Sequence, residues 1–410
     1  VFPGEADTAS TFRYANKGTI VVAQNGYVVD TTYVSGAAGW TDSVVTWFKT
    51  PTKRFKRFYH HNNLGQVDSI KVTTNATGID FYTRHYAYDS NTTLLKAIKL
   101  DTVTATQFGY TSELLRDSVT FPKSGAVRTD DISDVHTVLQ TNYSTAPLNG
   151  TFSGTFAYDS AGRLTESDYP TGLGIESELL SYDGLSQLTG RKLGVWNQQY
   201  NCQPGGGYDG YPCSDTTQFQ ISQDTAYVYD AGYNLDTLRS FKNDTVFATA
   251  KFTSAGRDST FGSYTFAHDL DGNRTAVSGA RTATYLFGAT GRLLSVTSGG
   301  TTLSFEYDAH GQLVHRRRNG ASDRYYLWDN GQLIAELDSS GNNRVAEYVY
   351  YPGATDAPLA LITGAVGARV IHYYHQDVMG NVLGTFSSSG ALEQTLQYDP
   401  WGQVEQASSS

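Results

Sequence analysis

A short phrase recurs along almost the whole chain, and it constrains the fold more than any other feature of the sequence. The phrase is an aromatic residue, then Asp or Asn, then two further residues, and then a Gly that precedes a polar and an aliphatic residue. It occurs twice within residues 307–337, as Tyr307-Asp308 with Gly311 and as Trp328-Asp329 with Gly331. Asp favours the first position of a turn, and Gly adopts the positive φ that closes the turn. Each copy therefore predicts a turn followed by a new strand.

Copies of the phrase occur from about residue 61 to residue 404, and from residue 287 they are spaced by 20 and then 21 residues. The residues assigned to the clearest predicted turns are Tyr158, Asp159, Gly162, His268, Asp269, Gly272, Tyr307, Asp308, Gly311, Trp328, Asp329, Gly331, Asp377, Gly380, Tyr398, Asp399 and Gly402. Weaker copies place Thr92 and Ser186 where Gly is expected. Self-similarity at such a period predicts a repeat array.

This phrase resembles the YD repeat, whose family includes the Rhs proteins of bacteria, the C component of tripartite insecticidal toxins and the shell of teneurins. The resemblance covers about residues 55–405. One Tyr-Asp pair would be weak evidence, because both residues are common at turns, but about a dozen copies in register are a specific signal. In that family, tandem antiparallel β-hairpins wind into a spiral that closes into a hollow shell. The resemblance therefore implies an all-β spiral that forms all or part of such a shell.

The sequence predicts one β body instead of several unrelated domains. Only 17% of the residues are charged, whereas Gly and Tyr are abundant, as in β proteins with many turns. A single hairpin is too small to be stable, so neighbouring hairpins must pair. We expect an atypical β end cap at residues 1–54, the hairpin spiral at 55–405 and a flexible tail at 406–410. A loop insertion is expected at about 190–226, because 47 residues separate Tyr182 from Tyr229.

Charge and hydropathy argue against two classes of partner. The formal net charge is −10, whereas nucleic-acid binding requires a basic surface. The basic runs at residues 53–58 and 316–318 are more typical of a strand face and a hairpin tip. No stretch approaches the roughly 18 apolar residues of a membrane span. The first residues lack both Met and the features of a signal peptide, which suggests a processed or shortened chain.

The two cysteines, Cys202 and Cys213, lie close together in a segment rich in Gly and Pro. Such a loop can bring the two thiols within bonding distance, and a disulfide would suit an oxidising compartment. A pair of free thiols is the alternative.

Three motifs that suggest chemistry are better explained by turns. Residues 205–210 satisfy G-x-G-x-x-G, but prolines flank them where a nucleotide site needs a strand and a helix. Residues 269–273 resemble a calcium loop, but the Gly comes too early and no acidic residue closes the series. His372 and His375 fall on opposite faces of a strand, which suits zinc poorly. We therefore expect no cofactor, no metal site and no catalytic residues.

Two functions remain as hypotheses. In the first, which the resemblance implies, the chain is a structural shell that encapsulates a toxin polypeptide for delivery by a secreted polymorphic-toxin system, and another chain completes the shell where this one does not close. An acidic wall would attract a basic cargo. In the second, the chain is an extracellular or wall-associated adhesin that binds glycan or protein through its turn loops. Both place the protein outside the cell or at its surface.

Enzymatic functions are less well supported. An enzyme acting on sugars would need two carboxylates facing each other across a cleft, and the sequence does not single out such a pair. Rhs cores often cut themselves with paired aspartates in a segment that follows a phrase like Tyr398-Asp399-Pro400-Trp401-Gly402. The residues after Gly402 contain no Asp, so we expect no self-cleavage by this chain.

Overall fold

The structure is a computed structural model in which every element is a β-strand. It describes residues 11–15, 20–24, 28–35, 40–48, 53–74, 80–100, 103–122, 126–132, 138–144, 151–169, 175–201, 214–240, 245–351, 357–364, 368–377 and 379–409. Among these residues there is no α-helix, and none that could cross a membrane. Each strand pairs antiparallel with the next strand of the chain, from β1 to β34. The prediction of an all-β spiral of tandem antiparallel hairpins is confirmed.

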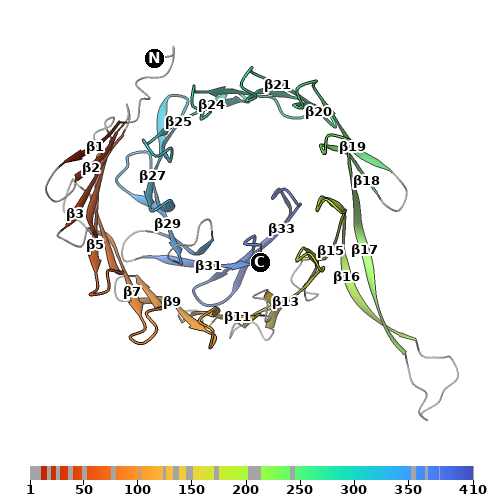
Figure 1. The fold of residues 1–410 in the computed structure, drawn as a ribbon, viewed down its shortest axis with the longest axis horizontal. Helices are drawn as coiled ribbons and strands as arrows, with labels where there is room; N and C mark the ends of the chain where they lie inside the picture. The colour runs from red at the N-terminus through yellow and green to blue at the C-terminus, as the bar shows by residue number, and fades with distance from the viewer. Residues whose placement is uncertain are drawn as a thin grey trace, which may run out of the picture.

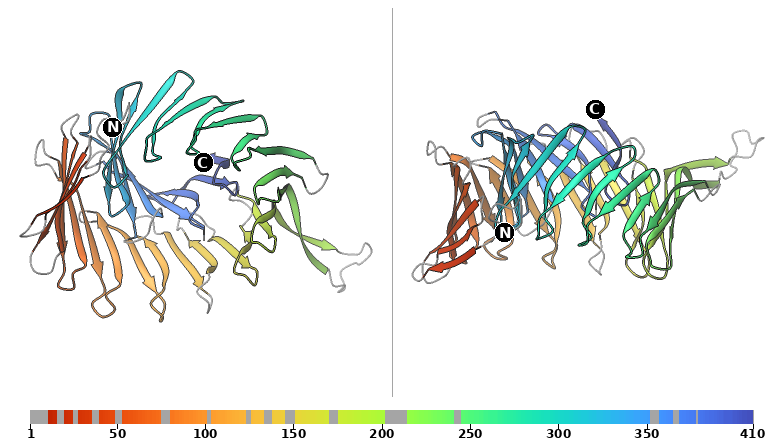
Figure 2. Two further views of the ribbon diagram at one scale, coloured as in Figure 1. Left: turned by 45° about the horizontal axis from the view of Figure 1, so that its top comes forward. Right: turned by 90° about the horizontal axis from the view of Figure 1, so that it is seen from above.

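The strands form one ribbon that curls through more than a full circle, so that its last part lies inside its first part (Figure 1). We name three sections: an outer layer of β1 to β18, a single wall of β19 to β25, and an inner layer of β26 to β34. The views in Figure 2 show that the strands run along the height of this ring.

The outer layer begins with ten strands: β1 (Thr11–Ala15), β2 (Ile20–Gln24), β3 (Val28–Ser35), β4 (Trp40–Phe48), β5 (Lys53–His61), β6 (Val67–Thr74), β7 (Asp80–Tyr88), β8 (Leu95–Leu100), β9 (Val103–Tyr110) and β10 (Arg116–Phe121). It continues with eight more: β11 (Ala126–Ile132), β12 (Val138–Ser144), β13 (Thr151–Tyr158), β14 (Leu164–Asp168), β15 (Ser177–Tyr182), β16 (Leu188–Asn201), β17 (Ser214–Tyr229) and β18 (Leu235–Arg239).

The single wall contains seven shorter strands: β19 (Val246–Phe252), β20 (Asp258–Phe261), β21 (Tyr264–His268), β22 (Arg274–Ser278), β23 (Ala283–Phe287), β24 (Leu293–Ser298) and β25 (Thr301–Tyr307). The inner layer contains nine: β26 (Leu313–Arg318), β27 (Ala321–Asp329), β28 (Gln332–Leu337), β29 (Arg344–Tyr350), β30 (Pro358–Thr363), β31 (Val370–Gln376), β32 (Val382–Ser387), β33 (Leu392–Tyr398) and β34 (Val404–Ser409).

The hydrophobic core lies between the outer and inner layers. One cluster joins β4 to β6 with β26 to β28 and includes Phe55, Val72, Tyr325 and Leu337, all at most 2% exposed. The other cluster joins β8 to β10 with β29 to β32 through side chains such as Ile98, Phe121, Ile362, Tyr373 and Phe386. Alternate residues of a strand face opposite sides, so each layer can bury one apolar face against the other. The curl of the ribbon is therefore what creates the core.

Three predicted boundaries differ from the structure. The end cap at 1–54 has no separate edge, because β4 pairs with β5 and β5 crosses residue 54. The predicted loop insertion at 190–226 is mostly a long hairpin, in which residues 190–201 of β16 pair with residues 214–226 of β17 and project from the ring (Figure 1). The predicted flexible tail at 406–410 is wrong for residues 406–409, which belong to β34 and pair with β33.

Candidate functional site: the repeat turns, the seam and the inner wall

Most of the predicted repeat turns share one geometry. The Asp N–H donates to the carbonyl four residues later, and the Gly N–H donates back to the Asp carbonyl. This geometry holds at Asp159 with Gly162, Asp269 with Gly272, Asp308 with Gly311, Asp377 with Gly380 and Asp399 with Gly402. The φ angles of these glycines lie between 77° and 94°, a region that L side chains rarely adopt. The Asp carboxylate accepts further backbone N–H groups of its own turn, as Asp399 does from Trp401 and Gln403.

The Gly position tolerates other residues at an energetic cost. Ser186, Tyr233 and Leu114 occupy it with φ angles of 67°, 64° and 65°. In the turn after Tyr88-Asp89 the residue with positive φ is Thr93, not the expected Thr92, because this turn is one residue longer. The backbone geometry is thus conserved along the ribbon more closely than the sequence phrase.

The turn at Trp328-Asp329 differs from the others. Only Asn330 and Gly331 separate β27 from β28, and both have positive φ, at 47° and 81°. Asp329 pairs with Gln332 in the ladder, as expected of a two-residue hairpin turn. Its carboxylate accepts a hydrogen bond from Tyr59 of the outer layer. The equivalence with the Tyr307 turn, predicted from the sequence, is therefore wrong in geometry.

The aromatic residue of the phrase connects one repeat to the previous one. Its polar atom donates to the main-chain carbonyl of the aliphatic residue that follows the preceding Gly. This bond is 2.8 Å at Tyr307 to Leu293, 2.9 Å at Tyr398 to Val382, and 2.7 Å at Trp328 to Leu313. The same bond recurs at Tyr88, Tyr182 and Tyr229. A ladder of side-chain hydrogen bonds thus runs along the ribbon beside the backbone ladder.

We expect Tyr307→Phe to lower the free energy of unfolding by about 0.5–1.5 kcal/mol, the net value of one hydrogen bond. The substitution removes only the hydroxyl that donates to Leu293 and keeps the ring. Urea denaturation followed by circular dichroism measures the change. Tyr285→Phe, on strand β23 of the same wall, is the matched control and should change stability less. An equal loss in both variants would contradict the ladder.

Two further predicted residues lie in and beside turns. His268 ends β21, and its Nε2 lies 2.9 Å from the Asp258 carboxylate. Tyr158 ends β13, immediately before the Asp159 turn. Cys202 and Cys213 fall outside the described residues, so their pairing remains a prediction.

The seam, by which we mean the contact between the outer and inner layers, contains charged groups buried from water. Arg84 of β7 donates to the Glu347 carboxylate of β29 at 3.2 Å and to the carbonyl of Tyr348 at 2.8 Å. Arg344 pairs with the other oxygen of Glu347 at 2.5 Å. Further along, Arg191 of β16 binds Glu405 at 2.7 Å, and its guanidinium also binds Glu178. The contacts of Arg84 with β29 and of Arg191 with Glu405 join segments more than 200 residues apart, so they hold the spiral closed.

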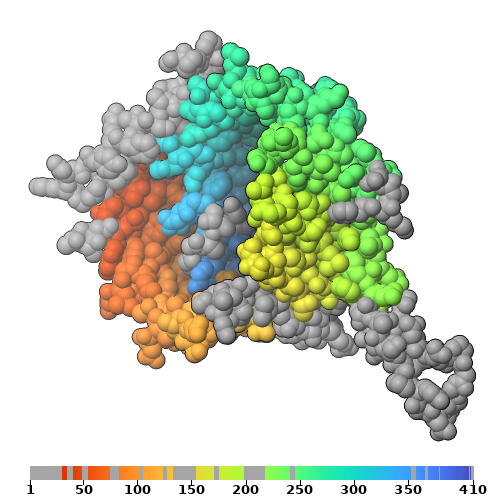
Figure 3. All heavy atoms as spheres, turned by 45° about the vertical axis from the view of Figure 1, so that its right-hand side comes forward, coloured from red at the N-terminus to blue at the C-terminus, as the bar shows by residue number. Residues whose placement is uncertain are grey.

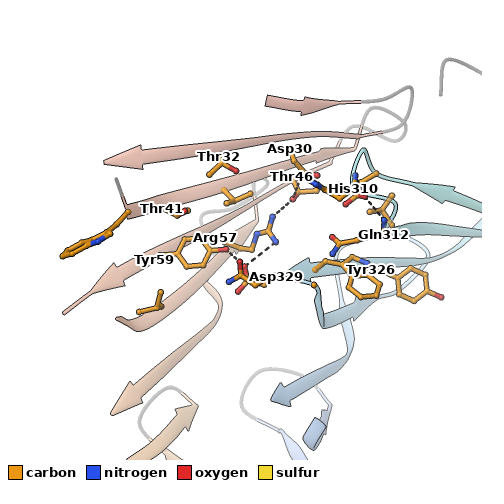
Figure 4. Close-up of a pocket in the computed structure, with 18 of the residues that line it drawn as sticks. Asp30, Thr32, Thr41, Thr46, Arg57, Tyr59, His310, Gln312, Tyr326 and Asp329 are labelled. Atoms are coloured by element: carbon orange, nitrogen blue, oxygen red, sulfur yellow. Dashed lines mark hydrogen bonds and ion pairs between the residues drawn. The ribbon is translucent and has the colours of Figure 1, made fainter. Parts of the chain in front are cut away.

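A cavity with a volume of about 490 Å³ lies in the seam. Figure 4 shows its walls: β3 to β5 provide Asp30, Thr46, Arg57 and Tyr59 on one side, and the inner layer provides Asp329 opposite. Arg57 donates to Thr46 at 2.9 Å, and Thr46 donates to Asp30 at 2.6 Å. The remaining lining includes Trp40, Asp308, His310, Tyr326 and Trp328.

The carboxylates of equivalent turns differ in acidity according to their place in the spiral. In the exposed turns, hydrogen bonds to the carboxylate lower the pKa of Asp159, mainly from Arg163, and that of Asp269, mainly from Asn273. Burial in the seam raises the pKa of Asp308 and of Asp377. Asp377 lines a second seam cavity of about 290 Å³ together with Glu178, whose pKa burial also raises.

The single wall has two chemically different faces. Residues directly opposite in an antiparallel ladder share a face, so the pairs Ala250–Phe261, Phe266–Val277 and Tyr285–Val296 trace one of them. This face carries Ala250, Phe261, Tyr264, Phe266, Val277, Ala283, Tyr285, Val296, Leu303 and Phe305. The other face carries mostly Thr and Ser, with Leu286 as an exposed exception.

The aromatic face points toward the centre of the ring. Glu306, on the polar face of β25, lies opposite His315 of β26, and His315 lies opposite Tyr325 of β27. The polar face is therefore on the same side of the ribbon as Tyr325, which packs on the outer layer. That side faces outward, because β27 lies inside β3 and β5 (Figure 1). The opposite, aromatic face is therefore the inner wall, and only Ala250 and Ala283 in it are fully buried. Figure 3 shows the surface hollowed here, with the inner layer (blue) recessed behind the green and yellow walls.

Sequence reasoning identified the turn residues but missed the seam residues. The partners of Arg84, Arg191 and Tyr59 lie 207 to 270 residues away, and no local pattern marks them. The only local signal was a charged residue at an alternate position of an otherwise apolar strand, such as Glu347 in β29. No group of His, Cys, Asp and Glu suited to a metal occurs in the described part of the chain.

The sequence model of the Teneurin YD-shell family matches residues 128–410. The chain is 25% identical over 272 residues to the double-stranded DNA deaminase toxin A of Burkholderia cenocepacia, a match that covers 61% of this chain and 17% of that protein. It is 26% identical over 180 residues to the tRNA3(Ser)-specific nuclease WapA of Bacillus spizizenii, covering 43% of this chain and 7% of the nuclease.

Among solved structures, the crystal structure of TcdB2-TccC3 without the hypervariable C-terminal region has the same fold. The TM-score is 0.64 at 11% sequence identity, and the match covers 98% of this chain and 23% of that one. The chain thus spans less than a quarter of the length of each of these relatives.

Proposed function

Because this chain belongs to the teneurin YD-shell family, we propose that it forms a section of a shell wall that encloses a toxin polypeptide. The observation that carries the proposal is the inner wall, where aromatic side chains face the ring centre and are only partly buried. Apolar surface left open on the inside of a curved sheet favours contact with unfolded polypeptide, whereas the polar outer face stays in water.

The ring acts by containment in this proposal, and not by catalysis. The seam keeps the spiral closed through its two core clusters and its buried ion pairs. A sheet closed on itself hides its edges from proteases and from other strands. The names of the relatives, a DNA deaminase toxin and a tRNA nuclease, support a toxin as the enclosed polypeptide. We propose secretion together with that toxin, and a further shell segment that completes the wall.

Protease protection of an attached polypeptide tests the proposal. The inner layer ends with β34 inside the ring, whereas β1, the first described strand, lies on the outside of the ring (Figure 1). We expect an unstructured reporter fused after residue 410 to be cleaved at least about 10-fold more slowly than the same reporter fused before residue 1. Equal cleavage rates would refute containment.

Two triple variants show whether protection of the reporter depends on the inner wall itself or only on where the reporter is attached. Phe266→Ser, Tyr285→Ser and Phe305→Ser together remove three aromatic rings from the inner wall and should reduce protection of the reporter. Thr265→Ala, Thr284→Ala and Ser304→Ala change the opposite face of the same strands and should leave protection unchanged. Loss of protection in both variants would instead indicate a general weakening of the ring.

A further inference from the structure

The cavity of about 490 Å³ in the seam has a lining that differs from the rest of the contact between the layers. Four aromatic side chains border it: Trp40 and Tyr59 from the outer layer, Tyr326 and Trp328 from the inner layer. Its volume falls within the range of ordinary ligand sites. A contact surface that served only packing would be filled by side chains, as the two core clusters are.

The aromatic wall at Trp40 is held in position by its neighbours. The indole stacks on His61 with ring centroids 5.4 Å apart. It also lies so close to Gly65 that a Cβ at that position would come within 2.9 Å of the ring. Gly65 itself has φ +81°, so both its backbone conformation and the nearby indole exclude a side chain at position 65. Trp40 is 37% exposed, which leaves part of its surface open to a ligand.

The charges that face the cavity do not balance. Asp30, Asp308 and Asp329 contribute three carboxylates, whereas Arg57 is the one arginine or lysine among the described residues of the lining, beside His61 and His310. Arg57 lies 3.9 Å from Asp329, which also accepts the Tyr59 hydroxyl. Asp308 is only 3% exposed, and its carboxylate accepts hydrogen bonds from the N–H groups of His310 and Gln312 in its own turn. Three carboxylates that share one arginine are costly to keep ionised away from water unless a further cation or a proton neutralises them.

The titration behaviour of the two carboxyl groups is consistent with that imbalance. Burial raises the pKa of Asp30, and it outweighs the opposing effects of Arg57, Thr46 and His310. Burial also raises the pKa of Asp308, and the nearby charge of Asp30 raises it further, against the hydrogen bonds of its own turn. A cation placed between them would favour the ionised form of both groups.

We propose that this cavity binds the side chain of a lysine or arginine presented by another polypeptide segment. The cation would lie between Asp30 and Asp308, and the aliphatic stem would pack against the rings of Trp40 and Trp328. Aromatic faces attract ammonium and guanidinium groups and also cover their apolar stems. A metal ion is disfavoured, because the described residues offer no cluster of three suitable ligands here. The site does not depend on the proposed enclosure of a toxin.

Titration of the whole chain with three probes tests the site. The probes are the peptide acetyl-Gly-Ser-Lys-Ser-Gly-amide, the same peptide with norleucine in place of lysine, and n-butylamine, with binding measured by calorimetry. We expect the lysine peptide to bind at least about 10-fold more tightly than the norleucine peptide, a difference of 1.4 kcal/mol. Equal affinity of the two peptides, or no binding of any probe, would overturn the proposal. Binding of n-butylamine as tight as that of the lysine peptide would overturn the polypeptide part of it.

Two variants and one matched control connect the binding to the cavity. Asp308→Asn and Asp30→Asn should each weaken the lysine peptide at least about 5-fold, because each removes one carboxylate that faces the cation. Asp269→Asn changes the equivalent turn carboxylate in the single wall, away from the cavity, and should leave the affinity unchanged. Equal weakening by Asp269→Asn would overturn the assignment. Melting temperatures of all three variants show whether the ring is intact.

Discussion

Replacing Glu347 with glutamine is expected to lower the free energy of unfolding by about 3–5 kcal/mol. The side chain of Glu347 is fully buried, and its two oxygens bind Arg84 and Arg344, whose side chains are 3% and 5% exposed. An amide in the same place removes the carboxylate charge that the two guanidinium groups share. Such a change costs far more than the loss of one hydrogen bond, because a buried charge must then be solvated by the protein alone.

The position of the Glu347, Arg84 and Arg344 cluster between the two layers predicts how the Glu347→Gln variant unfolds. Arg84 lies in β7 of the outer layer and Glu347 in β29 of the inner layer, so the bond connects residues 263 positions apart. We expect the inner layer to separate from the outer layer at lower urea concentrations than in the unmodified chain. Small-angle X-ray scattering and circular dichroism, recorded along the same urea series, follow the opening of the spiral and the loss of strands.

Asp323→Asn is the matched control for that experiment. Asp323 pairs with Arg316 at 2.6 Å, but the two side chains are 24% and 28% exposed. An ion pair open to water contributes only about 0–1 kcal/mol. If Glu347→Gln costs no more than Asp323→Asn, the buried charges do not hold the seam.

The turns were predictable from sequence because their chemistry is local. Asp159 accepts N–H groups two and four residues later, and Gly162 takes a φ of 77°, so one short segment contains the whole arrangement. The antiparallel pairing of successive strands follows from the same turns. The Trp328 turn shows the limit of this reasoning. With one residue fewer between Asp329 and Gly331, the same residue types form a different turn. The Asp329 carboxylate is then free of its own turn and accepts a hydrogen bond from Tyr59 of the outer layer.

The break in the repeat between Tyr182 and Tyr229 was misinterpreted because length can be added in two ways. An insertion between two strands makes a loop. An insertion on both sides of one turn lengthens the two strands of a hairpin, and no further copy of the aromatic-Asp-Gly phrase is needed. The structure shows the second, with strands of 14 and 16 residues at β16 and β17. The seam was unpredictable for a different reason, since the curvature of the ribbon, summed over all its strands, decides which hairpins meet.

Replacing Tyr325 with alanine is expected to cost about 3–5 kcal/mol, the usual loss for a large side chain in a packed core. Its ring is 0% exposed and lies between the two layers. It stacks on His315 of the inner layer at 4.2 Å between ring centroids and meets the edge of Phe48 of the outer layer at 5.3 Å. Truncation leaves a cavity that neither layer can fill, because both are fixed by their own ladders.

Tyr285→Ala is the control, because it compares an aromatic residue of the inner wall with the core residue Tyr325. Tyr285 belongs to the same kind of antiparallel ribbon, but it lies on the inner wall, where its ring is only partly buried. We expect it to cost less than half as much as Tyr325→Ala, as measured by urea denaturation under identical conditions. A loss as large as that of Tyr325→Ala would mean that the inner wall is already covered in solution, and the aromatic face would then be core instead of a surface open to an enclosed polypeptide.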